Sequence, residues 1–421
     1  MIPYEEAIRR IIDACEPLPS TLVDVDEAID RVLTSDVVSA ADLPPFDNSA
    51  MDGFALDTSA GVLPPGAELT VAGSRAAGDM AHDAGGMSCE IMTGARVPLG
   101  LDAVIPVEQV TVLDRTGQGE VSRIRLESAV AAGANIRRTG QDVRHGEVVL
   151  HAGQRLCPAS HMLLAALGVP AVPVVARVPV AVITTGRELV DDPAQVLASG
   201  EIRNSNGPFL ADRLAEADAA VVYRQTVGDD IAPFLESLQQ GIDRGAGVVI
   251  STGAVSMGRH DFVPEALRAV GARVIFHKVA IRPGKPLLFA RLSDGQLFFG
   301  IPGNPVSAAV AMRFFVEPAL RAMQGRAPTS CLQLPLARPL ETRAGFRYLL
   351  KARVHLDSEY RLRVDVLDGQ ESFRIRPLVA ANAWAIIPED ASRLAAGTVV
   401  QVVDLDGRGI RIDGSGDGDG T

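Results

Sequence analysis

The sequence predicts a multidomain α/β plus β protein, in which a doubly wound parallel α/β domain is combined with an inserted all-β domain and a small C-terminal β-barrel. Three observations support this fold class. Apolar β-branched runs alternate with helical stretches between residues 178 and 323. Short β-type runs separated by glycines fill residues 54–156, and period-two alternation returns after residue 325. With 421 residues, the chain can hold about two to four domains.

The composition is that of an ordinary soluble globular protein and argues against several classes of function. Hydrophobic residues make up 47% of the chain and charged residues 22%. The formal charge of −12 disfavours nucleic acid as a partner, although a local group of cations can still bind a small anion. No apolar run is long enough to span a membrane and the first residues are acidic, so we expect a cytoplasmic protein. The four cysteines lack C-x-x-C spacing, which argues against a zinc site and a disulfide framework.

The N-terminal segment is expected to be helical and extended. Apolar residues at helical spacing predict a helix over residues 5–15, and a second short helix is expected over 26–33. Residues 42–55 form a turn-rich segment that crowds acidic, amide and hydroxyl side chains between prolines and a glycine. A surface turn explains any single one of these side chains, but it explains the whole cluster less well.

The all-β domain is predicted from five short β runs between residues 69 and 150. Near its end, Arg137 and Arg138 are flanked by Gly133 and Gly140. Two adjacent arginines can lie on a solvated face, or they can form a fork that binds phosphate. The sequence favours neither explanation over the other.

The α/β domain is predicted from strands near residues 180–184, 220–223, 248–250 and 274–276, with helices near 207–217, 231–243 and 262–270. The run 248–250 is β-branched and lacks polar alternation, as expected of a strand buried on both faces. Small residues and hydroxyls follow it up to Asp261. Their backbone can approach a ligand closely, and an anion is the expected ligand.

Polar side chains follow each predicted parallel strand, and they should therefore meet at one edge of the sheet. They include Glu188, Asp229, Thr252 and Lys278. Acidic groups alone would repel an anion, but Mg²⁺ bound to Glu188, Asp229 and Asp261 would reconcile the opposite charges. Helix capping by each of these two aspartates is an equally good explanation.

Three cations, Lys278, Arg282 and Lys285, occur within eight residues and are bracketed by prolines around a glycine. This segment is not a Walker loop, and no G-x-G-x-x-G follows any predicted strand. No G-x-S-x-G motif is present either. Kinase, dehydrogenase and α/β-hydrolase functions therefore lose their main support. At the far end, residues 413–421 have a glycine–aspartate composition that predicts disorder.

Several long motifs, in order and spacing, resemble the molybdopterin molybdenumtransferase family, to which bacterial MoeA and the E domain of gephyrin belong. They are Pro45-Phe46-Asp47-Asn48-Ser49-Ala50-Met51-Asp52-Gly53, Met92-Thr93-Gly94, Asn135-Ile136-Arg137-Arg138, Ser251-Thr252-Gly253-Ala254-Val255-Ser256-Met257-Gly258, Pro283-Gly284-Lys285-Pro286 and Gly300-Ile301-Pro302-Gly303-Asn304-Pro305. The likeness runs from the first predicted helix to the C-terminal barrel.

This resemblance implies the last step of molybdenum cofactor synthesis. Adenylylated molybdopterin and molybdate would react with Mg²⁺ to give the cofactor and AMP. It also implies a homodimer, and a molybdopterin adenylyltransferase and molybdoenzyme maturation proteins as partners. The implied domains are residues 1–45 with 140–177 (linker and dimerisation), 46–139 (inserted β domain), 178–325 (adenylyltransferase-like α/β domain that binds molybdopterin), 326–412 (β-barrel) and the tail 413–421.

The matching motifs also imply site residues. Catalytic roles fall on Asp52, Thr93, Asp142, Glu188, Asp229, Asp261, Lys278, Arg282, Pro302 and Pro305, with Asp229 and Asp261 as metal ligands. Substrate-binding roles fall on Arg137, Ser251, Thr252, Gly253, Ser256, Gly258, Lys285, Asn304, Lys351 and Ser372. The chain departs from the family pattern at Arg282, commonly lysine, at Ala254, usually glycine, and at Glu371, typically glycine. The acid at 371 weakens the expected molybdate contacts of Lys351 and Ser372, and the planar guanidinium at 282 alters the molybdate contact expected at that position. The alanine at 254 indicates that a positive φ is not required there, or that the backbone there is strained.

Two other functions fit parts of the sequence. The α/β domain resembles the adenylyltransferase of the preceding step, so the chain could bind or adenylylate molybdopterin without inserting metal. The gephyrin likeness also allows a dimeric scaffold that clusters other proteins. No added interaction linker or long exposed apolar stretch favours the scaffold.

Overall fold

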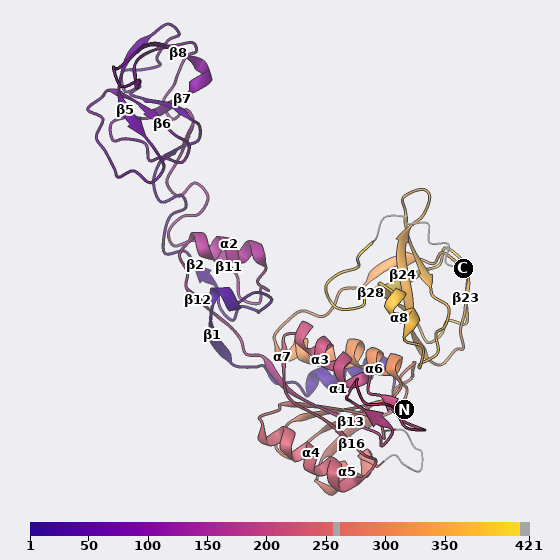
Figure 1. Cartoon of the computed structure of the whole chain (residues 1–421). Coiled ribbons are helices and arrows are strands. Elements are labelled where there is room, and N and C mark those ends of the chain that lie inside the picture. The colour runs from indigo at the N-terminus through magenta and orange to yellow at the C-terminus, as the bar shows by residue number, and fades with distance from the viewer. Residues whose placement is uncertain (256–261, 413–421) are drawn as a thin grey trace. The chain divides into compact units, whose positions relative to one another are not determined.

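The structure is a computed structural model that describes residues 1–255 and 262–412. The chain forms two compact units (Figure 1). Unit 1 comprises residues 1–21 and 175–421, and unit 2 comprises residues 22–174. The finer division into four domains stays a prediction, and the C-terminal tail lies outside the described residues.

Unit 1 contains a six-stranded sheet with the order β16-β13-β17-β21-β20-β18. The neighbours from β16 to β21 pair in parallel, whereas β20 is antiparallel to both β21 and β18. The predicted doubly wound sheet is thus present, with β20 as one antiparallel strand next to the edge strand β18. Its strands are β13 (Val178–Thr185), β16 (Ala219–Val227), β17 (Val248–Thr252), β18 (Arg273–His277), β20 (Leu288–Arg291) and β21 (Leu297–Ile301).

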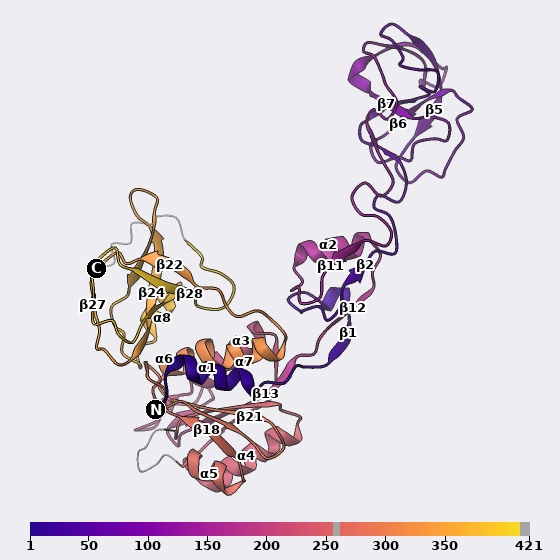
Figure 2. The ribbon, with the colours of Figure 1, turned by 180° about the vertical axis from the view of Figure 1, so that it is seen from behind.

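Helices cover both faces of this sheet because its central strands are apolar on both sides. All residues of β17 are buried, as its β-branched sequence predicts. One face packs against α1 (Tyr4–Asp13), α3 (Asn206–Glu216), α6 (Pro305–Ala311) and α7 (Glu317–Met323). The other face packs against α4 (Ile231–Asp243) and α5 (Val263–Ala269), as Figure 2 also shows.

A π-helical turn (Met312–Val316) joins α6 and α7 into one buried helix. Arg313 and Arg213 both donate to the Glu317 carboxylate, and Arg313 also pairs with Asp404. These four side chains are buried. They tie α3 and the long helix to the C-terminal sheet, because buried charges need such partners.

The C-terminal part of unit 1 is the predicted small β structure. Its sheet has the order β19-β24-β26-β28-β22, with β25 paired to β24. Its elements are β19 (Ile281–Arg282), β22 (Leu332–Pro335), β24 (Arg347–Leu356), β25 (Leu362–Val366), α8 (Arg376–Ala380), β26 (Ala383–Ile387), β28 (Val399–Asp404) and the ribbon of β23 (Leu340–Glu341) with β27 (Arg393–Leu394). Alternate residues of these strands form one apolar core.

Unit 2 contains a six-stranded sheet with the order β7-β4-β6-β5-β9-β8, which confirms β structure in the inserted segment. In β4, Phe54 and Leu56 face one core and Ala55 faces another, as the period of two requires. The strands are β4 (Gly53–Leu56), β5 (Glu68–Arg75), β6 (Ser88–Ile91), β7 (Ala103–Pro106), β8 (Val110–Arg115) and β9 (Val121–Leu126), and a 3₁₀ turn (Val107–Gln109) precedes β8.

The rest of unit 2 consists of short ribbons and α2. It includes β1 (Ser20–Asp24), β2 (Val37–Val38), β3 (Asn48–Ser49), β10 (Ile136–Arg137), β11 (Val148–Leu150), α2 (Pro158–Ala166) and β12 (Ala171–Val175), and the boundary between the units falls in the β1–β12 ribbon. The helix expected over 26–33 is wrong. Only a 3₁₀ turn (Val25–Glu27) forms, because Asp30 adopts a φ of 68° and Val32 and Leu33 bridge to Arg155 and Val174.

Within residues 1–255 and 262–412, no helix combines the length and apolar character needed to cross a bilayer.

Candidate functional site

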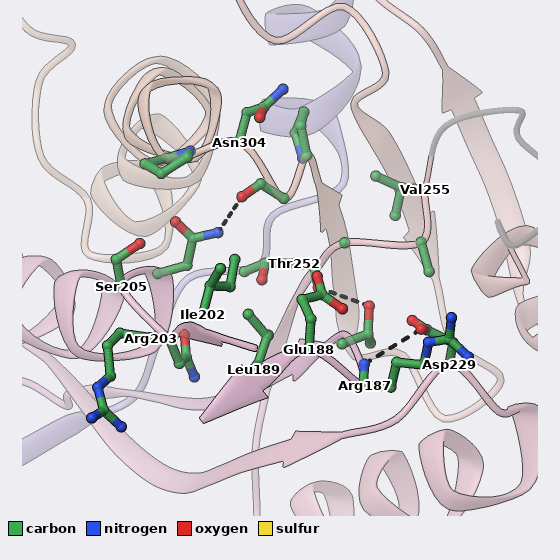
Figure 3. A pocket seen from close by; sticks show the side chains of 18 of the residues that line it. Arg187, Glu188, Leu189, Ile202, Arg203, Ser205, Asp229, Thr252, Val255 and Asn304 are labelled. Atoms are coloured by element: carbon green, nitrogen blue, oxygen red, sulfur yellow. Dashed lines mark hydrogen bonds between the residues drawn. The ribbon is translucent and has the colours of Figure 1, made fainter. Parts of the chain in front are cut away.

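Unit 1 holds a cavity of about 1070 Å³ at the carboxyl ends of β13, β16 and β17 (Figure 3). This is the edge at which the sequence predicts a ligand. Of the predicted site residues, the cavity is lined by Glu188, Asp229, Thr252, Gly253, Pro302, Asn304 and Pro305. Topology therefore brings together residues that are up to 117 positions apart, from Glu188 to Pro305.

Two carboxylates border this cavity at the ends of neighbouring strands. Glu188 follows β13 and Asp229 follows β16, and Figure 3 shows both side chains beside Arg187. The Asp229 carboxylate accepts a long hydrogen bond of 3.4 Å from the Arg187 amide. Asp230, not Asp229, is the N-cap residue of α4. Asp229 thus joins two strand ends, and helix capping no longer accounts for it.

The Glu188 carboxylate folds back over Gly186. A Cβ atom at position 186 would lie 2.8 Å from both Glu188 carboxylate oxygens, and the φ of Gly186 is 148°. Glycine is therefore needed at position 186 for Glu188 to take this position.

The donor set fits a magnesium ion. Mg²⁺ is commonly held by one or two protein carboxylates, with phosphate and water oxygens completing its shell. Glu188 and Asp229 offer two carboxylates on one cavity. Among the described residues, no cluster of three or more His, Cys, Asp or Glu side chains is arranged to hold a metal. Asp261, the other predicted ligand, lies outside the described residues.

The loop after β17 forms the floor of the cavity with its backbone. Gly253 has a φ of 89°, and a Cβ atom there would lie 2.6 Å from Thr185 Oγ1. The Thr185 hydroxyl donates to the Thr252 carbonyl at 3.0 Å. Glycine is therefore needed at 253 for this packing against Thr185, and the Gly253 amide donates to the Ile301 carbonyl at 3.1 Å.

The predicted residues on either side of Thr252 and Gly253 differ in backbone conformation and burial. Ala254 has a φ of 50°, so the position does use the left-handed backbone that glycine usually supplies, at a cost of about 1–2 kcal/mol. Ser251 is fully buried, and its hydroxyl has no hydrogen-bond partner in the described residues. It does not line the cavity. Ser256 and Gly258 lie outside the described residues.

The segment before α6 closes another side of the cavity. Asn304 is the N-cap residue of α6, and Pro305 begins the helix. The Asn206 side chain donates to the Gly303 carbonyl at 2.8 Å, which ties this segment to the start of α3. The predicted residues Pro302, Asn304 and Pro305 are thus held in place at the rim.

A polar cluster centred on Asn204 lies beneath the cavity and was not predicted. The Asn204 amide donates to the hydroxyls of Thr184 and Thr226 and to the carboxylate of Asp191, at 2.8–3.0 Å. Its carbonyl oxygen accepts from the Gly207 amide. The polar run at 203–206, directly before a predicted helix, is the signal that could have revealed it.

The three predicted cations do not line the cavity. Lys278 follows β18, which runs parallel to β21 because β20 is antiparallel to both. Lys278 is therefore at the same edge of the sheet, in a backbone conformation with a φ of 75°. Arg282 and Lys285 both make cation–π contacts with Phe346, with their charged groups 4.7 Å and 5.9 Å from the ring centre.

Lys351 anchors a loop of the C-terminal β structure, and the molybdate contact that the resemblance implies for it stays a prediction. Its side chain is fully buried, and Nζ donates to the carbonyls of Gly369 and Arg374 at 2.6 Å and 3.1 Å, with a longer contact to Glu371. Burial lowers the pKa of this amine. Lys351 therefore organises the loop that carries Ser372, whose carbonyl accepts from the Val306 amide at the start of α6.

In unit 2, Asp52 and Thr93 form a clamp. The Thr93 amide and hydroxyl both donate to Asp52 Oδ1, at 2.6 Å and 2.8 Å. These two hydrogen bonds lower the pKa of the Asp52 carboxyl. The carboxylate therefore stays charged near neutral pH, and these bonds leave its other oxygen, Oδ2, unused.

The Asp52 and Arg137 segments meet at β3. The Gly94 amide donates to the Ser49 carbonyl, and Arg137 in β10 pairs with Asn48. Arg138 is bound to Asp47, whereas Arg137 is exposed and makes no ion pair within the described residues. One arginine of the pair is thus structural and the other is available to a ligand.

Asp142 lies in the loop that follows β10. It is exposed, and its amide donates to the Leu43 carbonyl. This backbone bond fixes its position in unit 2, and its predicted catalytic role stays a prediction.

Family models match almost the whole chain. The MoeA N-terminal region (domain I and II) matches residues 2–168, a probable molybdopterin binding domain matches 181–322, and the MoeA C-terminal region (domain IV) matches 333–405. The cavity lies in the segment matched by the second model, with Phe373 and Ile375 contributed by the third.

Individual relatives agree with these matches. A molybdopterin molybdenumtransferase of Synechococcus elongatus is 40% identical over 414 residues, which cover 96% of this chain and 100% of the relative. That of Bacillus subtilis is 32% identical, covering 96% and 94%. The crystal structure of a molybdopterin biosynthesis MoeA protein from Pyrococcus horikoshii matches with a TM-score of 0.76 and 28% identity, covering 96% of this chain and 99% of that one. The chain therefore belongs to the MoeA family of molybdopterin molybdenumtransferases.

Proposed function

We propose that this protein is a transferase that inserts molybdate into adenylylated molybdopterin and releases AMP, with Mg²⁺ as cofactor. The observation that carries the proposal is the cavity at the carboxyl edge of the α/β sheet. There, Glu188 and Asp229 stand beside the Thr252–Gly253 backbone in a chain that matches MoeA along its length.

Each side of the cavity has a role in this reaction. We assign the phosphate of the substrate to the side of the cavity that Thr252 and Gly253 line, because open α/β sheets bind ligands at the carboxyl ends of their strands. Glu188 and Asp229 hold Mg²⁺, which when bound supplies positive charge against the charge that develops at the breaking phosphoryl bond. Lys278, at the same edge, adds a fixed cation.

We further propose a homodimer in which Asp52, Thr93 and Arg137 of one subunit act on the substrate held by the other. The Asp52–Thr93 clamp supports this role because it fixes a charged carboxylate on the surface of unit 2. Mixing an Asp52→Ala subunit with an Asp229→Ala subunit should then restore activity, since one of the two sites in the mixed dimer is intact. Two inactive variants that stay inactive when mixed would contradict shared sites.

The protein would act in the cytoplasm, beside the adenylyltransferase that supplies its substrate and the maturation proteins that receive the cofactor. An adenylyltransferase function for this chain is not favoured, because the MoeA N- and C-terminal regions flank its molybdopterin-binding domain.

The deciding experiment incubates purified protein with adenylylated molybdopterin, Mg²⁺ and molybdate, and follows AMP release. We expect release to need both Mg²⁺ and molybdate. Release without molybdate, or no release under any condition, would refute the proposal.

A further inference from the structure

Two large apolar side chains line the polar cavity and are not covered by the protein. Phe373 is 64% exposed and Ile375 is 42% exposed, and both belong to the loop between β25 and α8. Scattered apolar residues on a convex surface need no explanation, but apolar side chains that line a cavity are typical of ligand sites.

The loop that carries these side chains is fixed on both sides of Phe373. Lys351 Nζ holds the carbonyls of Gly369 and Arg374, and the Gln370 side chain donates to the carbonyls of Lys351 and Leu367 at 2.8 Å and 2.7 Å. The Val306 amide holds the carbonyl that directly precedes Phe373. A segment with these anchors presents its side chains in one place, which lowers the entropy cost of binding.

The Phe373 ring also has a cation on one of its sides. The Arg374 guanidinium lies 6.0 Å from the ring centre, and its Nε pairs with Glu371 at 3.1 Å. A ring supported in this way can offer its remaining surface to a planar partner.

A second apolar contact lies in the same cavity. Leu189 and Ile202 are paired across the β14 (Leu189–Val190) and β15 (Ile202–Arg203) ladder, directly beside Glu188, and Ile202 is 53% exposed (Figure 3). The cavity therefore combines carboxylates and backbone groups with apolar side chains. A ligand that fits both kinds of surface carries a phosphate and a flat, weakly polar ring.

We propose that Phe373 and Ile375 form an apolar wall against which a flat heteroaromatic ring of the substrate packs. Adenine and pterin share this chemistry, and the substrate named in the proposed function contains both. The inference rests on that function and deepens it, because it names residues that bind the ring of the substrate and do not bind its phosphate.

The test measures binding by calorimetry with AMP, with ribose 5-phosphate and with pterin-6-carboxylate. Ribose 5-phosphate has the sugar and phosphate of AMP but no ring. We expect Phe373→Ala to weaken AMP binding about tenfold, which equals about 1.4 kcal/mol, and to leave ribose 5-phosphate unchanged. Phe373→Trp should retain AMP binding, because stacking tolerates any large aromatic ring. The control is Val379→Ala on α8, a side chain that is 81% exposed and does not line the cavity.

The outcomes separate the two ring sources. A loss confined to AMP assigns the wall to adenine, and a loss confined to pterin-6-carboxylate assigns it to the pterin. Phe373→Ala with wild-type affinity for both rings overturns the inference, as does an equal loss for ribose 5-phosphate. If wild-type protein shows molybdate-dependent AMP release while Phe373→Ala binds both rings normally, only the inference fails. Wild-type protein that binds neither ring and releases no AMP refutes the proposed function as well.

Discussion

Replacing Lys351 with methionine tests whether this buried amine organises its loop or contacts molybdate. Methionine keeps much of the side-chain volume and removes the charge and the donors. Lys351 Nζ makes two short hydrogen bonds, to the carbonyls of Gly369 and Arg374. Hydrogen bonds from a charged group are worth about 1.5–3 kcal/mol each.

The net effect should be smaller than the sum of these bonds. The loop is exposed at Glu371 and Arg374, so its carbonyls can regain water, and the burial cost of the amine, seen in its lowered pKa, disappears. We expect Lys351→Met to destabilise unit 1 by about 3 kcal/mol. For a unit of this size, that corresponds to a fall in Tm of roughly 6–12 °C.

A single tryptophan provides an intrinsic fluorescence probe for the Tm measurement. Trp384 is the only tryptophan, it is buried, and it pairs directly with Lys351 across β24 and β26. Its fluorescence during thermal unfolding reports on this sheet. Arg353→Met, at an exposed position two residues along the same strand, is the matched control and should leave Tm unchanged. Wild-type Tm for Lys351→Met, together with lost molybdate binding, would refute the positioning role and restore the direct contact.

Three further changes test other parts of the site. Asp229→Ala should leave the fold intact and abolish Mg²⁺-dependent AMP release, and wild-type rates would remove the metal assignment. Thr93→Val removes one bond to Asp52, so the lowered Asp52 pKa should rise toward its ordinary value of about 3.9 in an NMR titration. An Asp52 pKa that is unchanged in Thr93→Val would contradict the role of this hydrogen bond. Because the Asp52 pKa is lowered in the folded state, the clamp stabilises unit 2 above about pH 4 and loses this contribution as the pH falls through the lowered value. Gly253→Ala should lower the free energy of unfolding, measured with denaturant, more than Gly345→Ala does. Both glycines have φ near 90°, but of the two only position 253 is crowded, by Thr185. Equal losses of unfolding free energy would show that the structure relieves the crowding.

The sequence was informative where a local pattern has a topological consequence. Parallel strands direct their carboxyl ends to one edge, so Glu188, Asp229 and Thr252 could be placed on a common site from the order of strands and helices along the chain. The glycine at 253 could be singled out as a position where the backbone is closely approached, but the sequence alone did not show that the approaching group is Thr185.

Other features depend on contacts that no local pattern contains. The helix expected over 26–33 failed because bridges to residues 155 and 174 outweigh local propensity. The burial of Lys351 depends on a loop about twenty residues later in the chain, and the sequence offers no sign that its three acceptors will surround it. Phe373 lines the cavity from the loop between β25 and α8, far along the chain from the strands that define the edge.

A crystal structure of the protein with AMP and Mg²⁺ would test the central claim most directly. We predict that the phosphate lies on the backbone of Thr252 and Gly253, that the metal is bound by Asp229, and that the ring packs on Phe373. AMP bound elsewhere on the chain, with the cavity beside Glu188 containing only water, would contradict the account.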